Sequence, residues 1–183
     1  MRLGHIIKHA SDGMPNMPDW RPKLRSRADG NPRIMGILNI TPDSFYGQSR
    51  YETVESATGE AIAMAENGAD WIDVGGESTR PGSQAVPPRE EEARVVPVIE
   101  SIRDELPDIG ISIDTRRSTV ASASLDAGAD MINDVSSLGD SGMADVIVEY
   151  RCPVCLMHMK GTPENMQKNP VSYTHLTLPT SSW

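Results

Sequence analysis

Short apolar runs alternate with longer alanine-rich stretches along most of this chain. The runs are rich in β-branched residues and cover residues 34–39, 71–74, 111–114, 131–135 and 154–159. Between them, apolar residues recur at helical spacing near 53–67, 89–106, 117–127 and 142–151. Because strands that alternate with helices form βαβ units, this pattern predicts an α/β protein built on a parallel sheet.

The ends of the predicted helices carry residues that favour helix initiation or termination. Thr53 suits an N-cap of the first helix, and Asn67-Gly68 suits its end. Three glutamates follow Pro88 in the first turn of the second helix, where acidic groups interact favourably with the helix dipole. Pro97 lies inside that helix and is expected to kink it, because an interior proline costs about 3 kcal/mol.

One segment of the chain echoes another. NGADWIDV at 67–74 and AGADMINDV at 127–135 share a Gly-Ala-Asp exit from a helix that leads into an apolar strand. The echo aligns Asp73 with Asn133. Repeated βα units are expected to give this kind of internal similarity.

Polar residues stand at the ends of the predicted strands. The carboxyl ends of parallel strands lie on one side of the sheet, where ligand sites form. At any single position the alternative is a polar residue that merely ends a strand before a loop, but the set as a whole predicts a binding mouth. The first four strands contribute Asn39, Asp73, Asp114 and Asn133-Asp134, and the fifth carries His158.

The alternation of side chains along a strand adds detail to this mouth. If Asn39 points into it, so does Ile37, and if Asn133 does, so does Val135. A partly apolar floor with few hydrogen-bonding groups suits a flat heteroaromatic ligand. A carboxylate such as Asp114 can accept two parallel N–H bonds from an amidine-like ring edge, and an asparagine amide can donate and accept at once.

Two loops have a composition that indicates function. One spans 41–51 and the other 75–88, and both are rich in glycine, proline and hydroxyl residues. Thr79 and Arg80 in the second loop offer a hydroxyl and a guanidinium group that could hold an anion. The alternative is a solvated linker, although long loops in compact domains are uncommon without a role. Neither loop contains a Walker A or G-x-G-x-x-G phosphate motif.

The composition narrows the class of protein. The chain has 183 residues, with 17 basic and 26 acidic side chains and a net charge of −9, which disfavours nucleic acid or an anionic membrane as partner. No apolar run approaches the roughly 20 residues of a membrane span, and the N-terminus lacks the features of a signal peptide. We therefore expect a cytoplasmic protein with an arm or cap at 1–32, one domain at 33–170 and a separate tail at 171–183.

The CPVC segment at 152–155 raises the question of a redox or zinc site, with His158 close behind it. A redox pair belongs at a helix start, whereas Pro153-Val154 begins a predicted strand, and there is no second cysteine pair to complete a zinc site. Buried strand thiols and a structural histidine are therefore the favoured interpretation.

Five segments form an ordered set that extends over about 33–169. They are MGILNITPDSF, IDVGGESTRPGS, SIDTRR, INDVSSL and PVCLMHMKGTPENMQ. Together they resemble the dihydropteroate synthases, a folate-pathway family that joins p-aminobenzoate to a dihydropterin diphosphate, and they stand in that family's order and spacing. The resemblance implies a (β/α)8 TIM barrel, with about the first five strands and four helices present here, and a site at the carboxyl mouth.

The resemblance also assigns roles by position. Asn39 is similar to the family's Mg²⁺ ligand, which also meets the diphosphate. Thr79, Asp114 and Asn133 resemble substrate-binding residues, the last two on the pterin edge. The residues similar to the apolar wall of the pocket are Ile37, Val135 and Met157.

The resemblance ends before the family's second half. A (β/α)8 barrel takes about 250 residues, and the segment VSYTHLTLPTSSW at 171–183 is unlike the family. We therefore expect this chain to be an inactive fragment, with a homodimer expected only of the full-length enzyme. Two rival functions stay open, the pterin-binding domain of a corrinoid methyltransferase and a non-catalytic, flavodoxin-like module of five strands.

Overall fold

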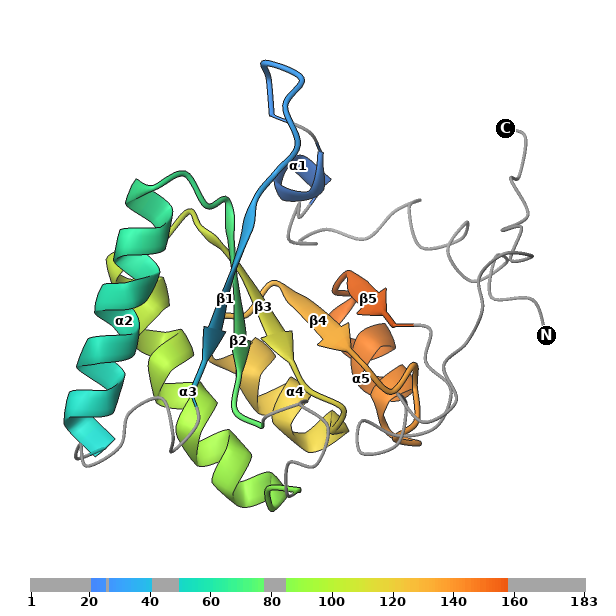
Figure 1. The fold of residues 1–183 in the computed structure, drawn as a ribbon. Helices are drawn as coiled ribbons and strands as arrows, with labels where there is room; N and C mark the ends of the chain where they lie inside the picture. Colours follow the sequence, from blue (N-terminus) through green and yellow to red (C-terminus); the bar gives the residue numbers. More distant parts are fainter. Residues whose placement is uncertain (1–20, 26, 41–49, 78–84, 158–183) are drawn as a thin grey trace, which may run out of the picture.

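The structure is a computed structural model that describes residues 21–25, 27–40, 50–77 and 85–157. It confirms the predicted alternation of strands and helices (Figure 1). All five strands pair in parallel within one sheet. The elements are α1 (Arg21–Leu24), β1 (Met35–Asn39), α2 (Arg50–Glu66), β2 (Trp71–Gly75), α3 (Pro88–Glu105), β3 (Gly110–Asp114), α4 (Ser118–Asp126), β4 (Met131–Asp134), α5 (Met143–Tyr150) and β5 (Val154–Leu156).

The strand order in the described sheet is β1-β2-β3-β4-β5. Each strand therefore lies beside its predecessor in the sequence, as successive βα units of a barrel do. A flavodoxin-like sheet has the order 2-1-3-4-5, so the flavodoxin-like alternative is wrong. None of the helices in the described ranges is long and apolar enough to cross a membrane.

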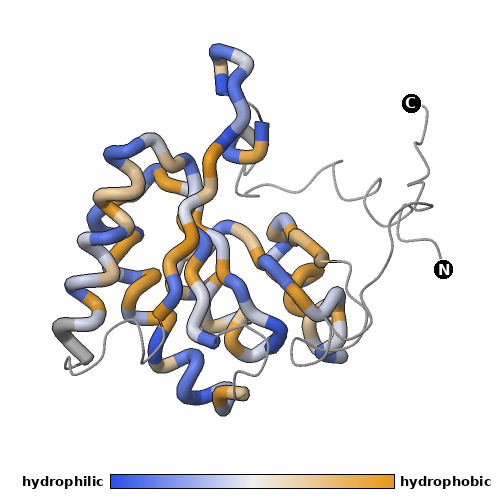
Figure 2. Tube along the Cα trace, viewed as in Figure 1, coloured by the Kyte–Doolittle hydropathy of each residue, from blue (hydrophilic) through white to orange (hydrophobic). Residues whose placement is uncertain are grey.

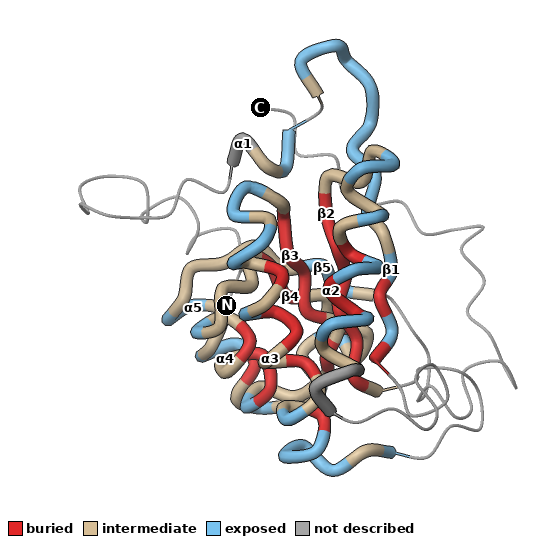
Figure 3. The backbone as a smooth tube through the Cα atoms, turned by 90° about the vertical axis from the view of Figure 1, so that its left-hand side faces the viewer, coloured by how far each residue is buried: buried red, intermediate tan, exposed pale blue. Residues whose placement is uncertain are grey.

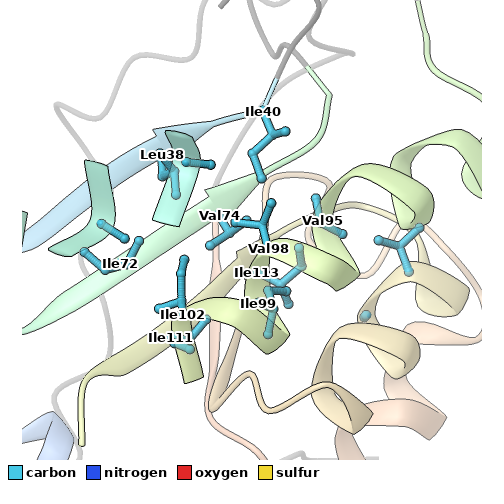
Figure 4. Packing of buried hydrophobic residues seen from close by; sticks show 14 of the residues in the cluster. Leu38, Ile40, Ile72, Val74, Val95, Val98, Ile99, Ile102, Ile111 and Ile113 are labelled. Carbon is cyan, nitrogen blue, oxygen red and sulfur yellow. The ribbon is translucent and has the colours of Figure 1, made fainter. Parts of the chain in front are cut away.

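The hydrophobic core lies between the sheet and α2–α5, which cover one of its faces (Figures 1 and 4). Apolar and polar residues alternate along the helices in Figure 2, because only one side of each helix packs on the sheet. Each fully buried aliphatic side chain stabilises the fold by roughly 1.5–3 kcal/mol. The strand residues of this core are Leu38, Ile72, Val74, Ile111, Ile113 and Ile132.

The other face of the sheet is covered unevenly (Figure 3). The central strands β2 and β3 are almost wholly buried, whereas β1 alternates between buried and exposed positions. Ile37 in β1 points away from the helices and is 66% exposed. In a closed barrel this face is the packed interior. In the described part of the chain, β1 and β5 are instead the edges of an open sheet.

The helix boundaries agree with the sequence at some ends and differ at others. The first predicted helix ends at Glu66, and Gly68 follows with φ +99°, as expected of an Asn-Gly stop. Its start is at Arg50, so the prediction of Thr53 as N-cap is wrong. The next helix, α3, begins with Pro88 and continues through Pro97 to Glu105, and the expected kink stays a prediction.

The two similar segments, 67–74 and 127–135, make the same kind of contact in the structure. Asp70 and Asp130 each precede a strand and accept a backbone N–H from its neighbour, Ile34 N at 2.8 Å and Ile111 N at 2.9 Å. Basic side chains pair with both carboxylates, among them Arg27 with Asp70. The repeated aspartate thus fixes the register where two strands enter the sheet.

A short helix that the sequence does not predict lies at the amino end of the sheet (Figure 1). The backbone oxygen of Lys23 in α1 accepts a hydrogen bond from Trp71 Nε1 at 3.0 Å. Its ammonium group binds Asp130 at 2.8 Å. These contacts fix α1 at the end of the sheet opposite the strand carboxyl ends. The 1–32 boundary of the predicted arm stays a prediction.

Candidate functional site

A row of side chains crosses the sheet where the strands end. The strand register aligns Asn39 with Gly75, Gly75 with Asp114, Asp114 with Asn133 and Asn133 with Cys155. Residues paired in this way point to the same face of a parallel sheet, and here that face is the one opposite the helices. Three residues that the sequence predicts for the site, Asn39, Asp114 and Asn133, therefore lie in one row.

A second row lies one pleat nearer the amino ends of the strands. Its register aligns Ile37 with Asp73 and Asp73 with Ser112. Ile37 lies beside the polar row as predicted and gives the site an apolar side. Both Asp73 and Ser112 are buried, 5% and 0% exposed respectively.

Gly75 leaves a space between two of the polar groups. A Cβ atom at this position would lie 3.4 Å from Asn39 Oδ1 and 3.7 Å from Asp114 Oδ2. The absence of a side chain at Gly75 therefore leaves both oxygens facing the same small volume.

Several buried polar atoms on this face lack a hydrogen-bond partner among the described residues. A buried polar atom without a partner costs about 1–3 kcal/mol, so three of them in adjacent positions indicate a surface that binds a polar ligand. The three atoms are Asp73 Oδ1, Ser112 Oγ and Asp114 Oδ1.

Asp114 is the electrostatically most perturbed group of the site. Burial raises its pKa to about 7, and the negative charges of Asp73, Glu91, Asp134 and Glu77 add to the effect. Both effects favour the protonated form of this carboxyl in the ligand-free protein. A strongly raised pKa in a polar site is typical of a functional residue.

Asn133 and Asp134 are neighbours in the sequence but have separate structural roles. The Asn133 amide donates from Nδ2 to Asp73 Oδ2 at 3.0 Å on the inner face. Asp134 is fully buried on the helix side, where it accepts hydrogen bonds from the backbone N–H groups of Ser136 and Leu138. Asp134 thus closes the turn after β4, and only Asn133 belongs to the row.

The other predicted site residues lie outside the described strands, so the sheet does not determine where their side chains point. Val135 follows the end of β4 and is half-buried, so strand alternation does not determine its direction. The half-buried Met157 lies just beyond β5, and its backbone N–H donates to Asp134 O at 3.2 Å. Thr79, Arg80 and His158 lie outside the described residues.

The expectation that both cysteines are buried strand thiols is wrong. Cys155 is exposed in β5, because this strand is an edge of the described sheet and its inner face is uncovered. Cys152 is half-buried against the core just before the strand, and burial raises its pKa to about 11. Both are free cysteines.

An ionic network that the sequence does not predict lies beside the mouth. Arg117, which directly precedes α4, pairs with Glu77 and with Glu91 of α3. Glu91 is 0% exposed and also accepts a hydrogen bond from Thr115 Oγ1 at 2.6 Å. The sequence did contain one sign of this burial. Glu91 lies on the same helix face as Val95, Val98 and Ile102, and that face is buried.

The network affects its two carboxylates in opposite ways. Burial raises the pKa of Glu91 despite the opposing contacts from Thr115 and Arg117. Burial also acts to raise the pKa of Glu77, but hydrogen bonds from Arg117 and Arg116 outweigh it and the pKa falls below its ordinary value. Glu77 also accepts from the backbone N–H of Val86 at 3.2 Å. The network therefore joins Glu77 and Val86 to α3 and to the start of α4.

The donors of the site suit a hard cation only in part. In the described ranges no group of three or more His, Cys, Asp or Glu side chains could hold a metal ion. Asn39 Oδ1 and the Asp114 carboxylate nevertheless face the space beside Gly75. Mg²⁺ prefers oxygen ligands and commonly keeps several waters and substrate phosphate oxygens. The residues present therefore fit a Mg²⁺ ion that the substrate helps to hold.

Comparison with known proteins identifies the family of this chain. Residues 35–180 match the family model described as "Pterin binding enzyme". The dihydropteroate synthase of Haemophilus influenzae is 43% identical over 139 residues, which cover 76% of this chain and 50% of the relative.

Two similar solved structures come from the same group of enzymes. A Clostridium difficile dihydropteroate synthase in the presence of pteroic acid gives a TM-score of 0.67 at 49% identity, covering 70% of this chain and 49% of the other. A Xanthomonas albilineans dihydropteroate synthase with 4-aminobenzoic acid gives 0.66 at 48%, covering 70% and 47%.

These comparisons confirm the (β/α)8 barrel as the fold class, of which the described residues form an open part with five strands. The chain spans about half the length of these synthases. The matched residues include all five strands and the whole polar row. The chain therefore belongs to the family of pterin-binding enzymes, and the relatives named above are dihydropteroate synthases.

Proposed function

We propose that this chain provides the pterin-binding part of a dihydropteroate synthase. Such an enzyme condenses 6-hydroxymethyl-7,8-dihydropterin diphosphate with p-aminobenzoate to give 7,8-dihydropteroate and diphosphate. The observation that carries the proposal is the set of buried oxygens at Asp73, Ser112 and Asp114, which have no partner within the described part of the chain and lie beside Asn133. The pteroic acid and 4-aminobenzoic acid of the related structures support the same substrate class.

In this proposal the pterin edge lies against Asp114 and Asn133. The Asp114 carboxylate accepts from the amino group and ring N–H of the pterin, which a carboxylate can do with two parallel bonds. Ile37, Val135 and Met157 form apolar walls for the ring, while Thr79 and Arg80 bind the anionic end of a substrate. Arg117 and Glu77 hold the described residues that flank this second loop.

The proposal assigns Asn39 to Mg²⁺. Bound there, the ion would neutralise the diphosphate as it leaves the pterin methylene carbon. This chain contributes the Asn39 amide oxygen, which is exposed at the end of β1 and faces the space beside Gly75. The fixed dipoles of the site then act on charge that develops in the reaction.

We expect Asn39→Ala to raise the Mg²⁺ concentration required for substrate binding. It removes one oxygen ligand, and the pterin diphosphate should lose roughly tenfold in affinity, while the diphosphate-free 6-hydroxymethylpterin changes little. Titration of both ligands at several Mg²⁺ concentrations measures the difference. Equal losses for the two ligands would assign Asn39 a purely structural role.

The activity itself is tested in an intact synthase in which this chain is completed by the second half of a relative. Diphosphate release and dihydropteroate formation, dependent on both substrates and Mg²⁺, are the expected results. Methyl transfer without diphosphate release would instead favour the corrinoid methyltransferase alternative. The inactivity of the 183-residue chain alone, a cytoplasmic location and a homodimer of the full enzyme stay predictions.

A further inference from the structure

Asp73 lies at the centre of the inner face but has no assigned role. It is 5% exposed in the middle of β2, and its register neighbour on β3 is the small Ser112. Asn133 lies on the next strand beyond, β4, and its amide reaches Asp73 across the intervening strand. A small residue on β3 is what permits side chains from alternate strands to meet here.

The contact determines which way the Asn133 amide faces. A carboxylate oxygen only accepts hydrogen bonds, so the end of the amide that faces Asp73 must be the NH₂ group. Nδ2 donates to Asp73 Oδ2 at 3.0 Å, which uses one of its two N–H bonds. The amide oxygen and the second N–H are left for a ligand.

The orientation sets the pattern of hydrogen-bonding groups at the mouth. Asn133 is the register neighbour of Asp114, whose Oδ1 has no partner among the described residues. With the amide held by Asp73, the Asn133 oxygen adds a second acceptor beside that carboxylate. A ligand edge with adjacent N–H donors then satisfies both residues, whereas an edge with a carbonyl in place of an amino group meets an acceptor.

We propose that Asp73 is a positioning residue that fixes the orientation of the Asn133 amide and thereby selects ligands with a ring amino group over ligands with a ring carbonyl. The inference rests on the proposed function for the ligand class. The contact between Asp73 and Asn133 is independent of it. The two parts are therefore tested separately.

The ligand test compares 6-hydroxymethylpterin with 6-hydroxymethyllumazine, which has an oxo group where the pterin has its 2-amino group. We expect the 183-residue chain to favour the pterin at least tenfold. The asparagine side chain in Asp73→Asn can also donate a hydrogen bond to Asn133, which allows the Asn133 amide to flip. The ratio of pterin affinity to lumazine affinity should then fall to roughly threefold or less. Exposed Asp108 provides the matched control, since Asp108→Asn makes the same change far from the site and should leave the ratio unchanged.

The outcomes separate a positioning role from general damage. If Asp73→Asn weakens both ligands equally and preserves their ratio, Asp73 is merely structural and the inference is wrong. If the unsubstituted chain binds neither ligand, the proposed function and the selectivity fail together, and the contact is judged by a measurement without ligand.

That measurement is nuclear magnetic resonance of the Asn133 side-chain amide in the ligand-free chain. We expect one of its two protons to exchange slowly with solvent, and this protection to be lost in Asp73→Ala. Exchange at the rate of a solvent-exposed asparagine in the unsubstituted chain would overturn the positioning role, whatever ligand binds.

Discussion

Replacing Arg117 with Met is expected to lower the free energy of unfolding by about 3–5 kcal/mol, the usual cost of removing one partner of a buried ion pair. The Arg117 side chain is 14% exposed and pairs with Glu77 and with Glu91, which is 0% exposed. Without the guanidinium, Glu91 is left as a buried carboxylate whose remaining donor among the described residues is the Thr115 hydroxyl. Urea unfolding of the two proteins at neutral pH measures the loss.

The pH dependence identifies the cause of this loss. The pKa of Glu91 is already raised in the folded protein, and removing Arg117 should raise it further. A carboxyl with a raised folded pKa costs no stability below its unfolded pKa. It destabilises the fold increasingly as the pH rises from the unfolded to the folded pKa, and the effect levels off above the folded pKa. The difference between variant and unsubstituted protein should therefore be smallest below about pH 4 and increase toward neutral pH.

Two further variants control for loss of packing. Adding Glu91→Gln to Arg117→Met removes the buried charge and keeps an oxygen for the Thr115 hydroxyl, so the double variant should regain at least about 1–2 kcal/mol. Glu90→Gln is the matched surface control. Glu90 is 53% exposed and pairs with Arg94 one turn away, so its loss should cost less than about 1 kcal/mol. A double variant no more stable than Arg117→Met would show that packing, not charge, is responsible.

Asp114→Asn is expected to weaken pterin binding and to stabilise the free protein. The substitution keeps the size of the side chain but turns one acceptor into a donor, which leaves a ligand N–H unpaired. The expected cost is about 1–3 kcal/mol, or roughly a 5- to 150-fold loss of affinity for 6-hydroxymethylpterin. Calorimetric titration of the 183-residue chain, with Asp145→Asn in α5 as an exposed control, measures it.

The gain in stability follows from the same carboxylate. Its pKa is raised from 3.8 to about 7, chiefly by burial and then by the charge of Asp73. Because the folded pKa lies above the unfolded one, the ionised group should destabilise the fold at pH 8 by up to roughly 4 kcal/mol. The contribution should vanish below about pH 4, where the group is protonated in both states.

Denaturation of both proteins from pH 4 to 8 tests this account. The stability advantage of Asp114→Asn should grow through the interval up to about pH 7 and then level off. An advantage that is the same at every pH would mean that the carboxyl titrates normally in the folded protein. Unchanged pterin affinity would remove Asp114 from the proposed site. Together the two effects would show a residue kept for binding at a cost in stability.

Local patterns in the sequence were sufficient for the framework of the site. Short apolar runs rich in β-branched residues located all five strands, and the helical period located α2–α5, because both patterns report which side chains must be buried in each element. Parallel pairing then placed the strand-end residues Asn39, Asp114 and Asn133 on one side of the sheet. The helix α1 was missed because four residues carry no measurable period.

The tertiary structure decided which polar residues contact one another and which have no partner in the part of the chain that it describes. Sequence alone could not distinguish Asn133, which faces the mouth, from Asp134, which closes a turn on the helix side. Nor could it show that Arg117 pairs with Glu91, that Asp73 holds the Asn133 amide, or that Asp114 has a raised pKa. Burial, charge and hydrogen bonding at these positions depend on atoms from strands and helices far apart in the sequence. They exist only once the sheet has brought those elements together, whereas the strand and helix patterns are contained within each segment.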